Sequence, residues 1–273
     1  MKHILVATDF SKTANNAVDY AVELAKATNA SITLFHVLNI PVMANDVPSV
    51  PHTSITELEK DGLQLLKKLR SDIALTCSEI NIDIDTRGGY AHDEINKMAR
   101  GSRYQLIVMG INGHGMASQL FGSTATSVAG NAKIPVLIVP TEAKFKTPEK
   151  IIFAFDYQEI KKTRHMDMLL KLAAPFNAKV HVLNIAGKAK EPFIEGTFAG
   201  IQVDDILYNT RHTLSTPTVE DTIQGIEHYL KINKSEMLVM IERKHGFFDW
   251  LFHGNNTMKM AFHTHIPLLV LHD

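Results

Sequence analysis

The stretch MGINGHGMASQLFGSTATSVAGNAKIPVLIVP, residues 109–140, decides the fold. It follows the apolar run YQLIVMG and ends in a second apolar run, KIPVLIVP. Both runs are typical of buried strands, whereas STATSVAGNA between them predicts a short helix. Four of the chain's 15 glycines lie within residues 110–122. A strand, a glycine-rich loop, a helix and a strand, in this order, predict a parallel α/β unit whose loop is suited to binding.

The pattern of apolar runs in this stretch occurs a second time near the end of the chain. Five short matches in the same order indicate an internal repeat of residues 1–143 in residues 149–273. The polar segment TEAKFKTPEK at 141–150 is expected to link the two copies. We therefore predict two domains of one kind. The matched segments are 3–11 with 150–158, 34–40 with 179–185, 106–110 with 237–241, 120–122 with 251–253, and 134–139 with 266–271.

Strand and helix patterns alternate within the first copy. HILVAT, SITLFHVL, IDIDTRGG, QLIVMG and IPVLIVP are typical of strands, and the segments between them contain helical patterns. Strands that alternate with helices pair in parallel through right-handed crossovers. Nearly continuous apolar strands fit a sheet covered on both faces. Each copy is thus predicted to be a doubly wound parallel-sheet α/β domain. Its first helix would be capped by Ser11 and buried along Ala17, Tyr20, Ala21 and Leu24.

Composition excludes several classes of protein. The net charge of −1 provides no global field for nucleic acid or acidic membranes. No apolar run approaches the roughly 20 residues that span a bilayer. The single cysteine, Cys77, fits a reducing compartment, and the start MKHILVATDFS resembles a strand and turn rather than a secretory signal. We expect a cytoplasmic protein that binds neither nucleic acid nor membrane.

The glycine-rich loop has features of a phosphate site. In doubly wound sheets, ligands lie beyond the carboxyl ends of strands, where the strand order reverses. Gly110 and Gly113 allow a ligand to approach the backbone, and Gly122, Ser123 and Thr124 open a helix whose free N–H groups favour an anion. Two other strand ends carry Thr8–Asp9 and Val37. Asp9 either contacts a ligand or caps the following helix through an Asx turn.

These motifs give the chain a resemblance to tandem universal stress proteins over essentially its whole length. The strand ending in Asp9 and the segment GINGHGMASQLFGS resemble the nucleotide motif of that family, although the interval from Gly113 to Gly122 is one residue shorter. The resemblance implies an adenine nucleotide alpha hydrolase-like fold, with ATP, ADP or AMP and Mg²⁺ bound by the first copy. Asp9 and Val37 would line the adenine and ribose pocket, Gly110 would touch the ribose, and the later loop would hold phosphates. The implied site residues are Ala7, Thr8, Asp9, Val37, Met109, Gly110, Gly113, His114, Gly115, Gly122, Ser123 and Thr124.

The second copy lacks most of the loop glycines. Ile241 and Lys244 replace Gly110 and Gly113, and neither side chain takes strained glycine angles cheaply. We predict that this copy does not bind nucleotide in the same way. Its aromatic segment, Phe247, Phe248, Trp250 and Phe252, belongs to a core, an interface or an apolar-ligand site, and Asp156 is expected to act as a cap. His263 and His265 are read as solvated residues rather than metal ligands.

Three functions remain open from the sequence. The first is a nucleotide-binding signalling module in stress resistance, as the resemblance implies. The second is a slow ATP-hydrolysing enzyme that uses His114 and Mg²⁺. The third is a nucleotide-free scaffold, or a binder of apolar ligands through the second copy. The resemblance also implies that the final strands, 134–139 and 266–271, join the copies as an internal pseudo-dimer; a homodimer of whole chains is a further option.

Overall fold

The computed structural model describes residues 1–38, 52–111, 123–155, 160, 163–184, 198–217, 222–242 and 265–272, with backbone alone at 52–56, 123, 198–199 and 222–224. We call residues 1–140 and their strands the first half, and residues 150–272 the second half. The elements of the first half are β1 (His3–Ala7), α1 (Lys12–Thr28), β2 (Ser31–Leu38), α2 (His52–Thr76), β3 (Ile82–Gly88), α3 (Ala91–Ala99), β4 (Leu106–Ile111), α4 (Ser123–Asn131) and β5 (Val136–Pro140).

The second half repeats much of this order. Its first helical segment is shorter, because a 3-10 turn and a helix of seven residues stand where the first half has the 17 residues of α1. The elements are β6 (Lys150–Ala154), η1 (Thr163–Met166), α5 (Asp167–Ala173), η2 (Ala174–Phe176), β7 (Lys179–Leu183), α6 (Phe198–Ile206), β8 (His212–Ser215), α7 (Thr222–Asn233), β9 (Met237–Glu242) and β10 (Leu268–His272).

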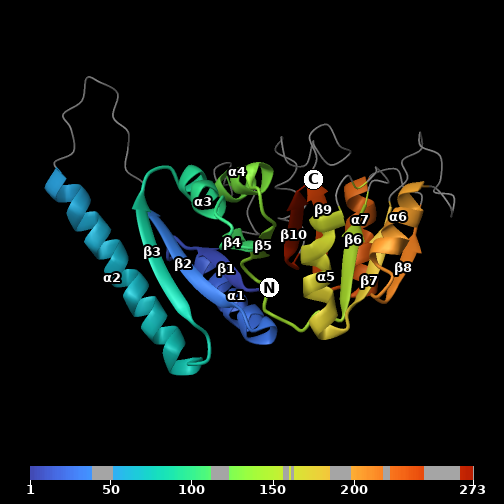
Figure 1. Cartoon of the computed structure of the whole chain (residues 1–273), viewed down its shortest axis with the longest axis horizontal. Coiled ribbons are helices and arrows are strands. Elements are labelled where there is room, and N and C mark those ends of the chain that lie inside the picture. The colour runs from blue at the N-terminus through green and yellow to red at the C-terminus, as the bar shows by residue number, and fades with distance from the viewer. Residues whose placement is uncertain are drawn as a thin grey trace, which may run out of the picture.

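The strands form one sheet in the order β3-β2-β1-β4-β5-β10-β9-β6-β7-β8 (Figure 1). Pairing is parallel everywhere except between β5 and β10, which run antiparallel. If β6 to β10 are matched with β1 to β5, the second half of the order is the first half reversed. The predicted doubly wound fold and the pairing of the two copies through their final strands are therefore confirmed.

The β5–β10 contact, which we call the seam, has a symmetric register. Leu137 pairs with Leu269, and these two residues occupy equivalent positions in the repeat. The flanking pairs are Ile138 with Leu268 and Val136 with Val270. A pseudo-twofold axis thus passes through the Leu137–Leu269 pair and relates the halves of the sheet.

Helices cover both faces of the sheet, which explains why the central strands are apolar throughout. All residues of β1, β5 and β9 are buried. Ile4 and Val6 point into one core, which α1, α2, α5 and α6 cover, and Leu5 and Ala7 point into the other, which α3, α4 and α7 cover. Each core contains residues of both halves, so the halves share their hydrophobic layers.

Helix α1 forms as its sequence predicts. The Ser11 hydroxyl accepts a hydrogen bond from the Ala14 N–H at 3.1 Å, so Ser11 is the N-cap. The expected apolar stripe is buried, and the helix ends at Asn29 in the left-handed region with φ 51°. The helix therefore starts close behind β1, with its N-terminus near the carboxyl edge of the sheet.

One of the sequence matches is not a structural equivalence. The segments 34–40 and 179–185 share the letters HVLNI. In the sheet, however, His3 pairs with Ser31, and its equivalent Lys150 pairs with Lys179. This register matches Thr33 with His181, so the shared letters lie three residues out of step. The prediction that these segments correspond residue by residue is wrong, because strand pairing follows the alternation of buried side chains rather than local identity.

The predicted linker is docked on the first half. The buried Asn16 amide donates to the carbonyls of Pro140 and Ala143, at 3.0 and 2.8 Å, and Lys144 donates to the Asn16 carbonyl oxygen at 2.8 Å. Phe145 packs between Tyr20 of α1 and Phe176 of η2, with ring centroids 5.2 and 6.4 Å away. The connection therefore fixes α1 against the second half rather than acting as a loose tether.

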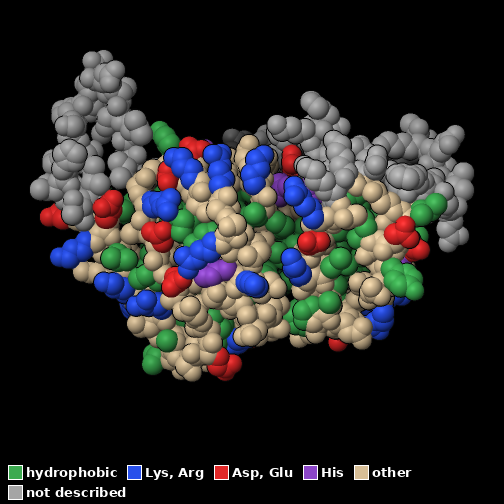
Figure 2. All heavy atoms as spheres, viewed as in Figure 1, with side chains coloured by type: hydrophobic (Ala, Val, Ile, Leu, Met, Phe, Trp, Pro, Cys, Tyr) green, Lys and Arg blue, Asp and Glu red, His purple; other side chains and the backbone are tan. Residues whose placement is uncertain are grey.

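The face of the molecule in Figure 2 carries acidic and basic side chains intermixed over both halves. This distribution matches the near-zero net charge. Within the described ranges, none of the helices has the length and apolarity needed to cross a bilayer.

A histidine of the second half completes the contact between the halves. His272 ends β10, and its Nε2–H donates to the carbonyl of Ala129 in α4 at 2.7 Å. Burial lowers the pKa of His272 to about 4, and the charges of Lys133 and His165 act in the same direction, against the opposing hydrogen bond to Ala129. Glu242 of β9 is the strand neighbour of His272. The imidazole is therefore neutral at physiological pH.

We expect this histidine to make stability depend on pH. Histidine in an unfolded chain has a pKa of about 6.5, so above that pH the ring is neutral in both states. As the pH falls from 6.5 towards 4, the unfolded chain takes up the proton first, and the free energy of unfolding declines by up to about 1.4 kcal/mol per pH unit. Urea denaturation from pH 7 to 4.5 should show a shallower decline for His272→Gln than for the wild type. Parallel curves for the two proteins would contradict this assignment.

Candidate functional site

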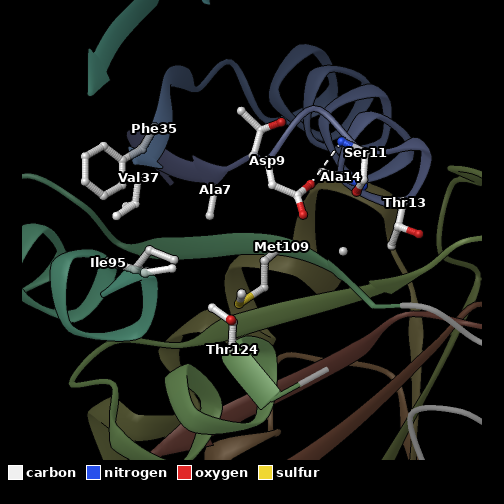
Figure 3. Close-up of a pocket in the computed structure, with 13 residues that line it drawn as sticks. Ala7, Asp9, Ser11, Thr13, Ala14, Phe35, Val37, Ile95, Met109 and Thr124 are labelled. Carbon is white, nitrogen blue, oxygen red and sulfur yellow. Dashed lines mark hydrogen bonds between the residues drawn. The ribbon is translucent and has the colours of Figure 1, made fainter. Parts of the chain in front are cut away.

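A cavity lies at the carboxyl edge of the first half, between β1, β2 and β4 on one side and α3 and α4 on the other (Figure 3). This is the crevice where a doubly wound sheet reverses its strand order, because β1 has β2 on one side and β4 on the other. The cavity is lined by Ala7, Thr8, Asp9, Ser11, Thr13, Ala14, Phe35, Val37, Ala91, Ile95, Met109, Gly110 and Thr124.

One end of the cavity is apolar. Phe35 and Val37 of β2 lie there with Ile95 of α3, while Met109 of β4 forms part of the floor (Figure 3). Phe35, Ile95 and Met109 belong to the same core as Ala7. These side chains present the kind of apolar wall that packs against a flat ring.

The other end of the cavity is polar. Ser11 and Thr13 lie there at the start of α1, and Thr124 of α4 lies across the cavity from Asp9 (Figure 3). The N-termini of α1 and α4 therefore both border the cavity. Their free N–H groups and positive dipole ends favour negative charge between them.

Asp9 forms the Asx turn that was one of its two predicted roles. Its Oδ1 accepts a hydrogen bond from the Ser11 N–H at 3.0 Å, and the residue is exposed at the mouth of the cavity. Because a carboxylate has two oxygens with several lone pairs, this single bond leaves acceptor capacity for a ligand. The turn thus fixes the direction of the carboxylate and is compatible with the second role.

A histidine that sequence reasoning did not place at the site holds this turn. The Nδ1–H of His36 donates to the Thr8 carbonyl at 2.8 Å, and its ring packs on Phe10 with centroids 4.6 Å apart. Phe10 has a φ of 63°, a conformation that is costly for an aromatic residue. The Phe10 N–H also donates to the Thr8 hydroxyl at 3.0 Å. His36 and Phe10 therefore clamp the backbone that presents Asp9.

Gly110 has a packing role that the sequence did not predict. It lies inside β4 rather than in the loop. A Cβ at this position would be 2.6 Å from the carbonyl oxygen of Thr13 and 2.8 Å from its carbonyl carbon. The missing side chain lets the start of α1 pack directly on β4. Gly110 also lines the cavity, and the approach of a ligand to its backbone stays a prediction.

The cavity brings together the predicted site residues whose side chains the structure describes: Ala7, Thr8, Asp9, Val37, Met109, Gly110 and Thr124. Gly113, His114, Gly115 and Gly122 lie outside the described residues, and for Ser123 the structure describes only the backbone, at the start of α4. Sequence reasoning missed Ser11, Thr13, Ala14, Phe35, Ala91 and Ile95 as lining residues. The four-residue spacing of Ala91 and Ile95 on a short helix was the available signal.

The corresponding edge of the second half is only partly described. Ile241, which replaces Gly110, is buried in β9, and it is not among the described residues with positive φ. Ile241 therefore takes no left-handed glycine angle, in agreement with the cost of such an angle for a β-branched side chain. Asp156, His263 and the segment from Lys244 to Gly254 with its aromatic residues lie outside the described residues, whereas His265 is exposed. Within the described part of the chain, no three His, Cys, Asp or Glu residues gather as a metal site.

Comparison with known sequences places the first half in one family. The profile of the Universal stress protein family matches residues 1–140. Universal stress protein MJ0531 of Methanocaldococcus jannaschii is 31% identical over 147 residues, which cover 52% of this chain and 84% of that protein. Universal stress protein YxiE of Bacillus subtilis is 31% identical over 148 residues, which cover 50% of this chain and 97% of that protein.

Comparison with solved structures extends the likeness of fold to the whole chain. A universal stress protein from Archaeoglobus fulgidus matches with a TM-score of 0.76 and 16% identity, covering 99% of this chain and 98% of that one. The functionally unknown protein PA1789 from Pseudomonas aeruginosa matches with a TM-score of 0.60 and 14% identity, covering 100% of this chain and 92% of that one. At these identities the comparison supports the fold alone.

The packing role of Gly110 can be tested by adding one methyl group. We expect Gly110→Ala to lower the free energy of unfolding by about 1–3 kcal/mol, because the new Cβ overlaps backbone atoms that cannot rotate away. Urea denaturation measures the change. Gly101→Ala is the matched control, since the nearest atom to its Cβ is the Met98 carbonyl oxygen at 4.0 Å. Equal effects of the two substitutions would refute the packing explanation.

Proposed function

This chain belongs to the universal stress protein family, and from that premise we propose that its first half binds ATP or a related adenine nucleotide, with Mg²⁺, in the cavity between α1, α3 and α4. In this role the protein is a signalling module of the stress response, and occupancy of the site changes its contacts with other proteins. The observation that carries the proposal is the separation of an apolar end and an anion-favouring end within one cavity at the strand-order reversal.

The apolar end suits the base. A purine packs against the wall of Phe35, Val37 and Ile95, while Asp9 accepts hydrogen bonds from ribose hydroxyls. The described cavity has a volume of about 180 Å³, below the roughly 300–1,000 Å³ that encloses a whole drug-sized ligand. It therefore accommodates part of a nucleotide, and the remainder extends along the two helix N-termini.

The polar end suits the phosphates. Thr124 and the N–H groups at the start of α4 would bind phosphate oxygens, together with Gly113, Gly122 and Ser123 of the glycine-rich loop. Mg²⁺ usually retains waters and binds through substrate phosphates with one or two carboxylates. A protein-only cluster of acidic ligands is therefore not required for it.

The second half has a different role in this proposal. The two domains span residues 1–143 and 149–273, and the second one binds no nucleotide in the same manner because its loop lacks the glycines. It serves instead as a structural partner across the seam. The buried, unpaired Cys77 agrees with a reducing, cytoplasmic setting.

Asp9→Asn tests the proposal because it separates the two roles of this residue. The asparagine oxygen still accepts from the Ser11 N–H, so the turn and the stability of the fold should be retained. The charge and the second acceptor oxygen are lost. We expect the dissociation constant of ATP–Mg²⁺, measured by isothermal titration calorimetry, to rise about tenfold.

The matched control is Asp156→Asn at the equivalent position of the second copy, which should leave binding unchanged. Mass spectrometry of small molecules released from the purified wild-type protein gives an independent readout. Absence of a bound nucleotide, together with no calorimetric signal on adding ATP–Mg²⁺, would reject the proposed function.

A further inference from the structure

The carbonyl groups at the C-terminal end of helix α4 need hydrogen-bond donors from outside the helix. It runs from Ser123 to Asn131, so the carbonyl groups of its last turn have no partner further along the helix. The Val128 carbonyl accepts from the Ala132 N–H, just beyond the helix, at 2.8 Å. The Asn131 side-chain amide donates to the Ser127 carbonyl, one residue earlier in the helix, at 2.8 Å. The Ala129 carbonyl instead accepts from His272, 143 residues later in the chain. The C-terminal turn of this first-half helix is therefore capped by the second half.

The surroundings of His272 determine the tautomer and the protonation state of its ring. A carbonyl only accepts, so the Nε2 that lies 2.7 Å from the Ala129 oxygen carries the proton. The other ring nitrogen, Nδ1, is enclosed and has no hydrogen-bond partner among the described residues. Protonating Nδ1 would bury an unsatisfied donor, and Lys133 and His165 oppose the added charge. The neutral ring with a single donated bond is thus the form that fits here.

From this contact we propose that His272 is a positioning residue for the nucleotide site, through which the second half holds α4 and thereby sets how well the first half binds its ligand. This inference rests on the proposed function. His272 touches no ligand; it acts through the helix. The other end of that helix carries Thr124, which lines the cavity about 1.4 helical turns from Ala129.

The rest of the helix is packed so that a change at one end reaches the other. Ala125, Val128 and Ala129 are buried in the core that also contains Ile95 and Met109 of the cavity. A short helix fixed along one face moves as a rigid body rather than by bending. Loosening its C-terminal turn therefore shifts or frays the N-terminal turn that faces the phosphates.

The arrangement is one-sided despite the pseudo-twofold axis. In the alignment of the final strands, the position equivalent to His272 is occupied by Pro140. Proline has no side-chain donor, so the first half offers no such bond in return. The first half thus receives a cap from the second half without supplying one. The first half therefore depends on the second for this bond, and the first half is also the one proposed to bind nucleotide.

The experiment compares two substitutions at His272 in the full chain. His272→Gln keeps an N–H donor on a side chain of similar reach, whereas His272→Leu keeps apolar bulk and leaves the Ala129 carbonyl without a donor. Two quantities are measured for each variant: amide hydrogen exchange of peptides covering residues 123–131 without nucleotide, and the dissociation constant of ATP–Mg²⁺. We expect His272→Leu to exchange about tenfold faster in α4 and to bind about fivefold more weakly, and His272→Gln to stay near wild type.

His212→Leu is the matched control. His212 also donates to a backbone carbonyl, that of Thr210, and it pairs with Asp204, but all three residues lie in the second half away from α4. Its replacement should leave both quantities unchanged. Unaltered exchange in α4 of His272→Leu would overturn the inference, as would equal losses in the Leu and Gln variants.

The exchange measurement separates this inference from the proposed function. If the wild-type protein binds no nucleotide, the proposed function fails, and with it the role of His272 in binding. Exchange then still decides whether His272 holds α4. If the wild type binds but His272→Leu binds equally well, the nucleotide site stands and the positioning role is rejected.

Discussion

The antiparallel pairing of β5 with β10 is the constraint on which the rest of the molecule depends. Each of these strands is apolar on both faces and lies at the end of its own parallel set. Without its partner, each would be a hydrophobic edge with unpaired N–H and C=O groups, which favours aggregation. Pairing around Leu137 and Leu269 removes both edges and makes the two cores continuous. The seam therefore joins the halves into one sheet with shared hydrophobic cores.

The seam also fixes the surroundings of the cavity. The carboxyl ends of β1, β2 and β4 face the same edge of the sheet because these strands are parallel. Helix α4, which closes that edge, packs beside β5, so the strand at the seam and the helix at the cavity are neighbours. The docked connection through Asn16 and Phe145 adds a second attachment, on α1. Both helices whose N-termini border the cavity are thus tied to the junction of the two halves.

The sequence predicted most of the architecture because its signals are local or periodic. Apolar runs indicate buried strands, Ser11 indicates the start of a helix, and the repeated final strands indicate two copies of one domain. The residues it misjudged are those whose role depends on another element. The HVLNI letters matched, but the register of β7 against β6 is set by burial across the pair. His36 has no distinctive spacing, and its hydrogen bond to Thr8 exists because β2 lies beside the end of β1. The role of His272 was not predicted at all, since nothing local in the sequence points to Ala129.

Gly110 and Ile241 occupy equivalent positions of β4 and β9, and the two positions are covered in different ways. In the first half α1 starts at Lys12, and its backbone fills the space beside β4, which leaves no room for a Cβ at Gly110. In the described part of the second half the first helical turn starts at Thr163, and buried Ile241 shares its core with Phe155 and Ile160. Backbone packing and side-chain packing are two ways to cover the same strand. In the first half, backbone packing brings the N-terminus of α1 to the strand ends. Gly110 thus lets the N-terminus of α1 border the cavity, where its free N–H groups favour an anion.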